Sequence, residues 1–305
     1  MTAQERQALT RLLIAFKRRL GSQICLFQEI VFEYATADAI AEDDFSQEIV
    51  VHDYVFYCFT KACKSLMAVS LLLDNRLPED AMILLRSVYE SYLHIVYVLQ
   101  NPDHIDDFVQ KKIGIYTGRF KHPVSKKGNK MCNQVIDSET GEISTYGIGI
   151  STLVHGSKYQ FDKEVHTVMF PFLSEHTHPN MIASGNYRED DIYYSYWQAS
   201  NTLQSAFYAV YISTLILSEA LVLEELVEAK EIKYQCRQSI KVCERFIALV
   251  ECPNPFDSFP NKVQSRLAEL VKHLSKRRYA YLKPYPKRKK YIIKELYRRS
   301  LYCWG

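Results

Sequence analysis

The sequence predicts an all-α protein, folded as a single bundle of about eight helices with a small inserted hairpin. Long stretches of the 305-residue chain repeat apolar residues at the 3.6-residue period of a helix. Glycine and proline number only ten each, so few residues interrupt these stretches. Hydrophobic residues make up 48% of the chain and aromatic residues 13%, which is enough apolar material for a substantial core.

The expected helices follow one another along the chain. The first runs from Ala3 to about Ala35 and is amphipathic, and the second runs from about Glu48 to Leu73. The third spans Leu77 to Pro102, with Pro78 in its first turn and Asn101-Pro102 as its stop signal. Shorter helices are expected over about Ile105–Tyr116, Glu164–Asn180, Ile232–Val250 and Pro260–Arg278, and the longest over about Asp190–Val227.

A polar insert, about residues 121–160, interrupts the helical pattern. Within it VIDSETGEI is typical of two short strands about a Ser-Glu-Thr-Gly turn, which predicts an exposed hairpin. We expect one bundle domain over residues 1–271 and a basic arm over residues 272–305. The segment Leu203–Leu223 is apolar enough for a transmembrane interpretation, but its Gln, Ser, Thr and Glu residues favour a core helix, and no membrane partner is expected.

The N-terminus and the cysteines indicate a cytoplasmic protein. The chain begins MTAQERQALTRLL, which lacks the apolar core of a signal peptide. Its eight cysteines are scattered without a C-x-x-C pair, so neither a zinc ribbon nor a dithiol redox motif is offered. No glycine-rich phosphate loop, G-x-S-x-G or HEXXH motif occurs, which argues against P-loop hydrolases and serine hydrolases.

The third helix carries polar side chains on an otherwise apolar surface. Arg86, Ser87, Glu90, Ser91 and His94 share one stripe, and Arg86 and Glu90 are i,i+4 neighbours that can form an ion pair. A helix that is apolar around most of its circumference is expected to be buried, so this stripe should lie in the interior. Because buried ionisable groups are costly unless paired, the stripe indicates either a structural lock or a functional site.

Two motifs carry a resemblance to a known group of proteins. Arg86-Ser87-Val88-Tyr89-Glu90 and Ser174-Glu175-His176-Thr177-His178-Pro179 resemble the R-S-x-x-E and S-x-x-x-H-P motifs of an uncharacterised all-helical prokaryotic family. The resemblance covers roughly Ala62 to Leu223. It implies a helical bundle in which Arg86, Glu90, Ser174 and His178 meet, and it brings no established reaction.

More distantly, a helical bundle with a buried arginine and a histidine near a polar cap resembles HEPN domains of prokaryotic toxin and phage-defence systems. Many of these are metal-independent RNases, in which an R-x4-6-H motif helps the RNA 2′-hydroxyl attack the adjacent phosphate. By this resemblance Arg86 would hold the phosphate charge, and His94 or His178 would transfer the proton. The spacing from Arg86 to His94 is R-x7-H, outside that pattern. The formal match is Arg266 to His273, which chance alone supplies in this composition.

We therefore expect a ribonuclease or related effector of an anti-phage defence system, with Arg86, Glu90, His94, Ser174 and His178 as its candidate catalytic residues. A second copy of the chain or another protein of such a system would be its protein partner. The alternative is a non-enzymatic nucleic-acid-binding or sensor module, in which the same residues form a structural polar network.

A metal site is a further alternative at these residues. His176 and His178, together with Glu90 and His94, carry metal-ligand atoms. The spacing E-x-x-x-H is not the E-x-x-H of carboxylate di-metal bundles, so we expect no metal and no cofactor. The same two histidines can equally end a helix by binding its free carbonyls.

The C-terminal arm is strongly basic. From Lys272 to Gly305 there are twelve Lys or Arg residues and one acid, Glu295, whereas the net charge of the whole chain is only +3. Tyrosines alternate with these charges, which suits phosphate contact combined with base stacking. We expect RNA or another single-stranded nucleic acid to bind Lys276, Arg277, Arg278, Lys287, Arg288, Lys289, Lys290, Tyr285 and Tyr291. The alternative is a basic surface that pairs with the acidic remainder or with an oligomer partner.

Overall fold

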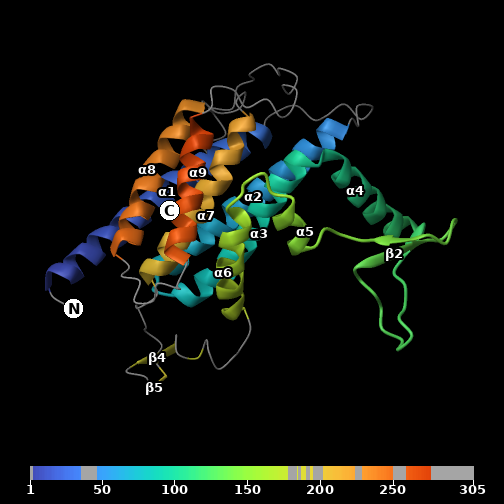
Figure 1. The fold of residues 1–305 in the computed structure, drawn as a ribbon, viewed down its shortest axis with the longest axis horizontal. Coiled ribbons are helices and arrows are strands. Elements are labelled where there is room, and N and C mark those ends of the chain that lie inside the picture. Colours follow the sequence, from blue (N-terminus) through green and yellow to red (C-terminus); the bar gives the residue numbers. More distant parts are fainter. Residues whose placement is uncertain are drawn as a thin grey trace, which may run out of the picture.

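The computed structural model describes residues 3–35, 47–177, 184, 187–189, 193–194, 202–223, 229–249 and 259–275. Within these residues the chain forms nine α-helices and two small sheets (Figure 1), so the prediction of an all-α bundle with a small inserted hairpin is confirmed. The helices are α1 (Ala3–Ala35), α2 (Gln47–Asp74), α3 (Pro78–Gln100), α4 (Pro102–Thr117), α5 (Ile150–His155), α6 (Asp162–Glu175), α7 (Thr202–Glu219), α8 (Ala229–Leu249) and α9 (Phe259–Leu274).

Helix α3 begins and ends where its sequence signals lie. Pro78 occupies the first turn, where the backbone N–H that proline lacks would have no acceptor within the helix. Glu79 and Asp80 follow in the same turn and favour the positive end of the helix dipole. At the other end the backbone N–H of Asn101 donates to the carbonyl oxygen of Tyr97, and Pro102 begins α4.

Helix α7 is the central element, because it contacts α1, α2, α3, α8 and α9. Every residue of α7 except Leu203 and Gln204 is buried. Its hydroxyl groups find partners inside the bundle: Ser213 Oγ donates to Gln23 Oε1 of α1 at 2.6 Å, and Gln23 Nε2 donates to Thr214 Oγ1 at 2.8 Å. A short 3-10 extension, η2 (Ala220–Leu223), continues the helix. The apolar stretch that raised a transmembrane interpretation therefore packs as a core helix.

Two other helices are long and apolar enough to cross a membrane by length and composition alone. They are Asp53–Asp74 within α2, and α3. Of the apolar window in α3, 67% is buried inside the bundle, as expected for a helix that other helices cover.

The helix expected from Asp190 begins later than predicted. Strands β4 (Arg188–Glu189) and β5 (Tyr193–Tyr194) pair antiparallel before α7 starts at Thr202. Tyrosine suits a paired strand, and this pairing takes residues 193–194 out of the helix.

The bundle also extends beyond the expected domain boundary at residue 271, because α9 includes Lys272 and His273 in its last turn. Residues 276–305 of the basic arm lie outside the described part of the chain.

Residues 118–149, called the finger below, extend from the end of α4, away from the other helices (Figure 1). They form an antiparallel sheet in the order β1 (Phe120–Lys121), β2 (Gln134–Asp137) and β3 (Ile143–Thr145). The predicted Ser-Glu-Thr-Gly turn joins β2 to β3. Its Gly141 has φ 74°, a region that favours glycine, and the Gly141 N–H donates to Asp137 O at 2.8 Å. Strand β1 and helix α5 were not predicted, because both are too short to show periodicity.

Candidate functional site

The predicted ion pair on α3 is present but only partly buried. Arg86 Nε lies 3.3 Å from Glu90 Oε1, and the two side chains remain 28% and 30% exposed. The expectation of a buried pair is therefore wrong. The apolar remainder of α3 packs against α2 and α7. Of the polar stripe, Ser91 is buried with it, and the other four residues are partly exposed.

Two residues from the end of α6 and the turn after it hold the Arg86 guanidinium. Arg86 Nη1 donates to Thr177 Oγ1 at 3.0 Å, and Arg86 Cζ lies 4.9 Å from the centre of the Phe170 ring. Nη2 makes no hydrogen bond to any residue in the described part of the chain. The guanidinium is thus fixed in position and keeps donors for an anion. Arg86, Glu90, Phe170 and Thr177 are called the Arg86 site below.

Ser174 lies one turn before Thr177 and does not reach Arg86. Ser174 Oγ donates to Phe170 O at 2.6 Å, and Thr177 Oγ1 donates to Ser174 O at 2.7 Å. Sequence reasoning did not select Thr177, although a hydroxyl beside a candidate histidine is a signal that could have found it. His178 follows Thr177 directly in the sequence and lies outside the described residues.

His94 faces a different neighbour from Arg86. Its Nδ1 is 3.0 Å from the Tyr54 hydroxyl on α2, and the two rings meet edge to face. Burial, and then the charge of Lys61, lowers the pKa of His94 to about 4. His94 is therefore a neutral imidazole held by α2, and the structure does not bring it to the Arg86 site.

Helix α6 and its C-cap carry two further histidines, His166 and His176, whose pKa values are lowered. His166 stacks on Phe170 with ring centres 4.9 Å apart, and burial lowers its pKa, helped by the nearby His155. His176 is 7% exposed, packs edge to face on Phe172, and also has a pKa lowered by burial. Sequence reasoning missed His166, whose signal was its i,i+4 spacing to Phe170.

A second polar cluster lies in the interior and centres on Arg266 of α9. The Arg266 and Asp162 side chains are 0% and 2% exposed, and Arg266 Nε lies 2.7 Å from Asp162 Oδ1. Arg266 Nη2 donates to the Tyr92 hydroxyl at 2.8 Å, and Tyr92 donates to Asp162 Oδ2 at 2.8 Å. The Ser157 hydroxyl gives Asp162 a further hydrogen bond, at 2.5 Å. We call this cluster the Arg266 network.

The network continues through Tyr159 to α7. Arg266 Cζ lies 3.8 Å from the centre of the Tyr159 ring, which His273 meets edge to face. The Tyr159 hydroxyl donates to Glu219 Oε1, and Lys158 Nζ lies 2.6 Å from Glu219 Oε2. Burial by itself would raise the pKa of Glu219, but the Lys158 charge and these hydrogen bonds lower it overall. Helices α3, α6, α7 and α9 are thereby joined through ion pairs, hydrogen bonds and the contact of Arg266 with the Tyr159 ring.

The Arg266 network is closed to large ligands. Arg266 is fully buried and His273 is 3% exposed, so neither side chain can touch an RNA phosphate in this fold. The formal R-x6-H match therefore belongs to a structural lock, in which Arg266 and His273 pack on Tyr159.

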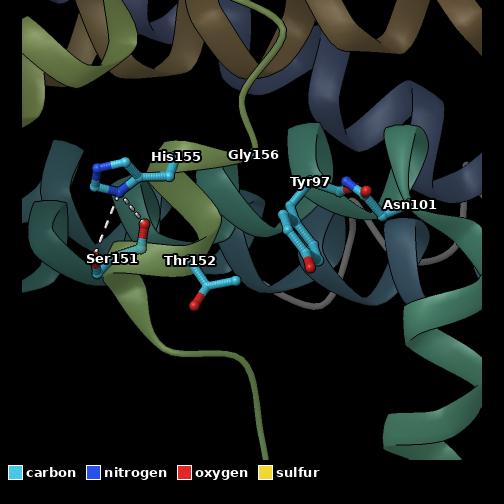
Figure 2. A pocket seen from close by; sticks show the side chains of 6 residues that line it. All are labelled: Tyr97, Asn101, Ser151, Thr152, His155 and Gly156. Carbon is cyan, nitrogen blue, oxygen red and sulfur yellow. Dashed lines mark hydrogen bonds between the residues drawn. The ribbon is translucent and has the colours of Figure 1, made fainter.

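A shallow pocket of about 530 Å³ lies between α5 and the end of α3 (Figure 2). Its lining residues are Tyr97, Asn101, Ser151, Thr152, His155 and Gly156. Ser151 Oγ is 3.4 Å from His155 Nδ1, but the same nitrogen is 2.7 Å from the Ser151 carbonyl oxygen. A proton on Nδ1 that is donated to this carbonyl leaves no base for the serine hydroxyl, so this pair is not an activated nucleophile.

The expected nucleic-acid contacts of the arm, from Lys276 to Tyr291, lie outside the described residues together with His178. Among the residues that the structure describes, no three His, Cys, Asp or Glu side chains gather closely enough to hold a metal ion. Of the side chains that the structure describes, one carboxylate and no imidazole is in direct contact with Arg86.

Fold and site together define an all-helical protein with a partly exposed arginine site and a separate buried ionic lock. Residues 52–192 match the model of a family of unknown function, DUF5677. The matched span is slightly less than half of the chain. It contains the Arg86 site and Asp162, whereas Arg266 and the basic arm lie beyond it. Neither a curated protein nor a solved structure matches the chain.

Proposed function

We propose that this protein acts on RNA, as an effector that cleaves single-stranded RNA at the Arg86 site without a metal ion. The observation that supports the proposal is that the Arg86 guanidinium is held in place but still partly exposed. Three contacts fix its guanidinium, yet 28% of the side chain is exposed and Nη2 has no partner among the described residues. A fixed guanidinium with free donors is suited to a phosphate oxygen, and it gains more from that contact than a mobile one.

The chemistry requires one cation and one base. Arg86 would hold the scissile phosphate while a base takes the proton of the 2′-hydroxyl, whose oxygen then attacks phosphorus. The phosphorus–oxygen bond to the 5′-oxygen breaks, and that oxygen takes a proton from water, while the base returns its own proton to the solvent. A 2′,3′-cyclic phosphate and a 5′-hydroxyl remain. We assign the base to His178, the residue after Thr177, and the orientation of Arg86 to Glu90.

His166 is the alternative base within the described residues. Its imidazole packs on the same Phe170 ring as Arg86, and its lowered pKa keeps it neutral at pH 7. Variants of His166 and His178 separate the two assignments, because the residue that takes the proton should control the pH profile of cleavage.

A second candidate is a non-enzymatic module that binds single-stranded nucleic acid or senses a signal. The observation that favours it is the charge balance of the Arg86 site, since Glu90 already neutralises Arg86 at 3.3 Å. In that case the site and the Arg266 network are both structural, and the basic arm does the binding. The defence role and the cytoplasmic location rest on the sequence alone.

The test is incubation of the purified protein with total RNA, an RNA oligonucleotide and its DNA counterpart, with and without a chelator. Cleavage of RNA only, insensitive to chelator and leaving a 2′,3′-cyclic phosphate, is expected. Arg86→Ala should lower the rate by roughly 100-fold or more, as for loss of a charge-stabilising donor. The control is Arg237→Ala, which removes an exposed arginine of α8 and should leave the rate of RNA cleavage unchanged.

Binding without cleavage would favour the second candidate. A stop codon after Ser275 tests the arm in either case, because it leaves α9 whole. If RNA affinity is unchanged in that truncated chain, the arm is not the binding element. If the parent binds neither RNA nor the DNA oligonucleotide and cleaves neither, the nuclease proposal and the nucleic-acid-binding module both fail.

A further inference from the structure

The finger separates its charges by sign. Between Gly118 and Ile136 it carries no Asp or Glu, but it has five cationic residues: Arg119, Lys121, Lys126, Lys127 and Lys130. The acids follow together, with Glu139 in the turn between β2 and β3 and Glu142 directly after it. The loop between β1 and β2 is therefore positive, whereas the turn between β2 and β3 is negative.

The positive loop is a small ordered hairpin in its own right. The Gly128 N–H donates to Ser125 O at 2.9 Å, and the Ser125 N–H donates to Asn129 O at 2.8 Å. Gly128 has φ 81°, as expected where a type I turn is followed by a left-handed residue. Lys126 and Lys127 occupy the two central positions of this turn, so hydrogen bonds hold their backbone in place before any partner arrives.

The lysines of this hairpin are not used by the fold. Lys126, Lys127 and Lys130 are exposed, and no carboxylate of the described residues lies within 4.0 Å of their amino groups. Two neighbouring cations differ, because Lys111 pairs with Asp107 at 2.7 Å and Arg119 lies 3.4 Å from Asp137. Three unpaired positive charges on one rigid loop form a surface for an anionic partner.

An exposed aromatic ring stands at the base of the finger. Tyr116 lies in the last turn of α4 and is 83% exposed. The helix ends at the next residue, Thr117, with Gly118 as its C-cap, and Arg119 of the positive stretch follows directly. Tyr116 and the three lysines lie toward opposite ends of β2, because the start of β1 pairs with Asp137 and the lysines precede Gln134. A strand that runs along the sheet can therefore stack a base on the ring and place phosphates at the lysines.

We propose that the finger, with Tyr116 at its base, is a binding surface for single-stranded nucleic acid, distinct from the C-terminal arm. Lys126, Lys127 and Lys130 contact phosphates, and Tyr116 stacks on an unpaired base. The negative turn at Glu139 lies at the other end of β2 from the three lysines, so it repels phosphates there and favours binding at the lysine end of the sheet. The inference rests on the proposed function only where it identifies the bound nucleic acid as the RNA substrate.

The experiment measures binding of the full-length protein to a labelled DNA oligonucleotide of about 12 nucleotides, a length within the range that such surfaces cover. DNA lacks the 2′-hydroxyl and cannot follow the proposed cleavage path, so binding is read alone. Replacing all three lysines (K126Q/K127Q/K130Q) should lower the slope of log affinity against log salt by about 2, and weaken binding roughly 100-fold at about 0.1 M salt. Tyr116→Ala should weaken binding roughly 5- to 150-fold with an unchanged slope.

The matched control is E139Q/E142Q, which changes the charge of the other turn of the same sheet and should leave binding equal to or tighter than that of the parent. Equal slopes for the parent and the triple lysine variant would overturn the proposal. So would binding to anionic phospholipid vesicles that depends on these lysines while oligonucleotide binding does not. The outcome is separable from the proposed function, because Arg86→Ala should lower the rate of RNA cleavage roughly 100-fold or more while reducing the salt slope by only about 0.7, the share of one phosphate contact.

Discussion

Replacing Asp162 by Asn removes the negative charge that balances the buried Arg266. The Asp162 carboxylate accepts hydrogen bonds from Arg266 Nε at 2.7 Å, Tyr92 at 2.8 Å and Ser157 at 2.5 Å. Removing one member of a buried ion pair costs about 3 to 5 kcal/mol, because the other charge is left uncompensated. The lower end, about 3 kcal/mol, is expected here, since Asn keeps one acceptor oxygen and Glu269 lies 3.9 Å from Arg266 Nη1.

Urea denaturation and thermal melting measure this loss. At roughly 2 to 4 °C for each kcal/mol in a domain of about this size, the melting temperature should fall by about 6 to 12 °C. The control is Asp107→Asn, which breaks the ion pair with Lys111 at a carboxylate that is 63% exposed and should cost less than about 1 kcal/mol.

A double variant, Asp162→Leu with Arg266→Met, removes both charges and should recover part of the stability lost by Asp162→Asn. If Asp162→Asn unfolds no more easily than Asp107→Asn, the Arg266 network is not a stabilising lock, and the reasoning is refuted.

Two further predictions concern His94 and the finger. The pKa of His94 in the folded protein, about 4, is below the 6.5 of the free side chain, so the unfolded chain takes up the proton first. The free energy of unfolding therefore does not depend on His94 above about pH 6.5 and decreases as the pH falls toward 4. At pH 5 this loss is about 2 kcal/mol at most. His94→Asn should flatten the dependence of melting temperature on pH between about 8 and 5. Parallel curves for the parent and this variant would contradict the lowered pKa of His94. Where α4 meets the finger, Gly114→Ala would place a Cβ 2.1 Å from Phe120 Cδ2, so the Phe120 ring and β1 with it must shift. This should cost about 1 to 3 kcal/mol, against about 1 kcal/mol gained in helix propensity. Hydrogen exchange of the finger amides should accelerate in Gly114→Ala but not in Gly149→Ala, whose Cβ would meet nothing within 4 Å. Equal exchange rates in the two variants would show that β1 does not depend on the close contact between Gly114 and Phe120.

The sequence by itself determined the local structure. The bounds of α3 follow from Pro78 and Asn101-Pro102, and the turn between β2 and β3 follows from the Ser-Glu-Thr-Gly segment, because capping and turn formation depend on residues only a few positions apart. The i,i+4 pairing of Arg86 with Glu90 belongs to the same class of local interaction.

Tertiary packing alone decided which polar groups are buried and with which partners. Asp162 and Arg266 are 104 residues apart in sequence and form the buried pair. Arg86 and Glu90 lie on a helix that is apolar around most of its circumference, yet they remain about 30% exposed. His94 shares a stripe with Arg86 but binds Tyr54 of α2. Helical periodicity shows which residues share a face, but the burial of that face depends on how completely distant helices cover it.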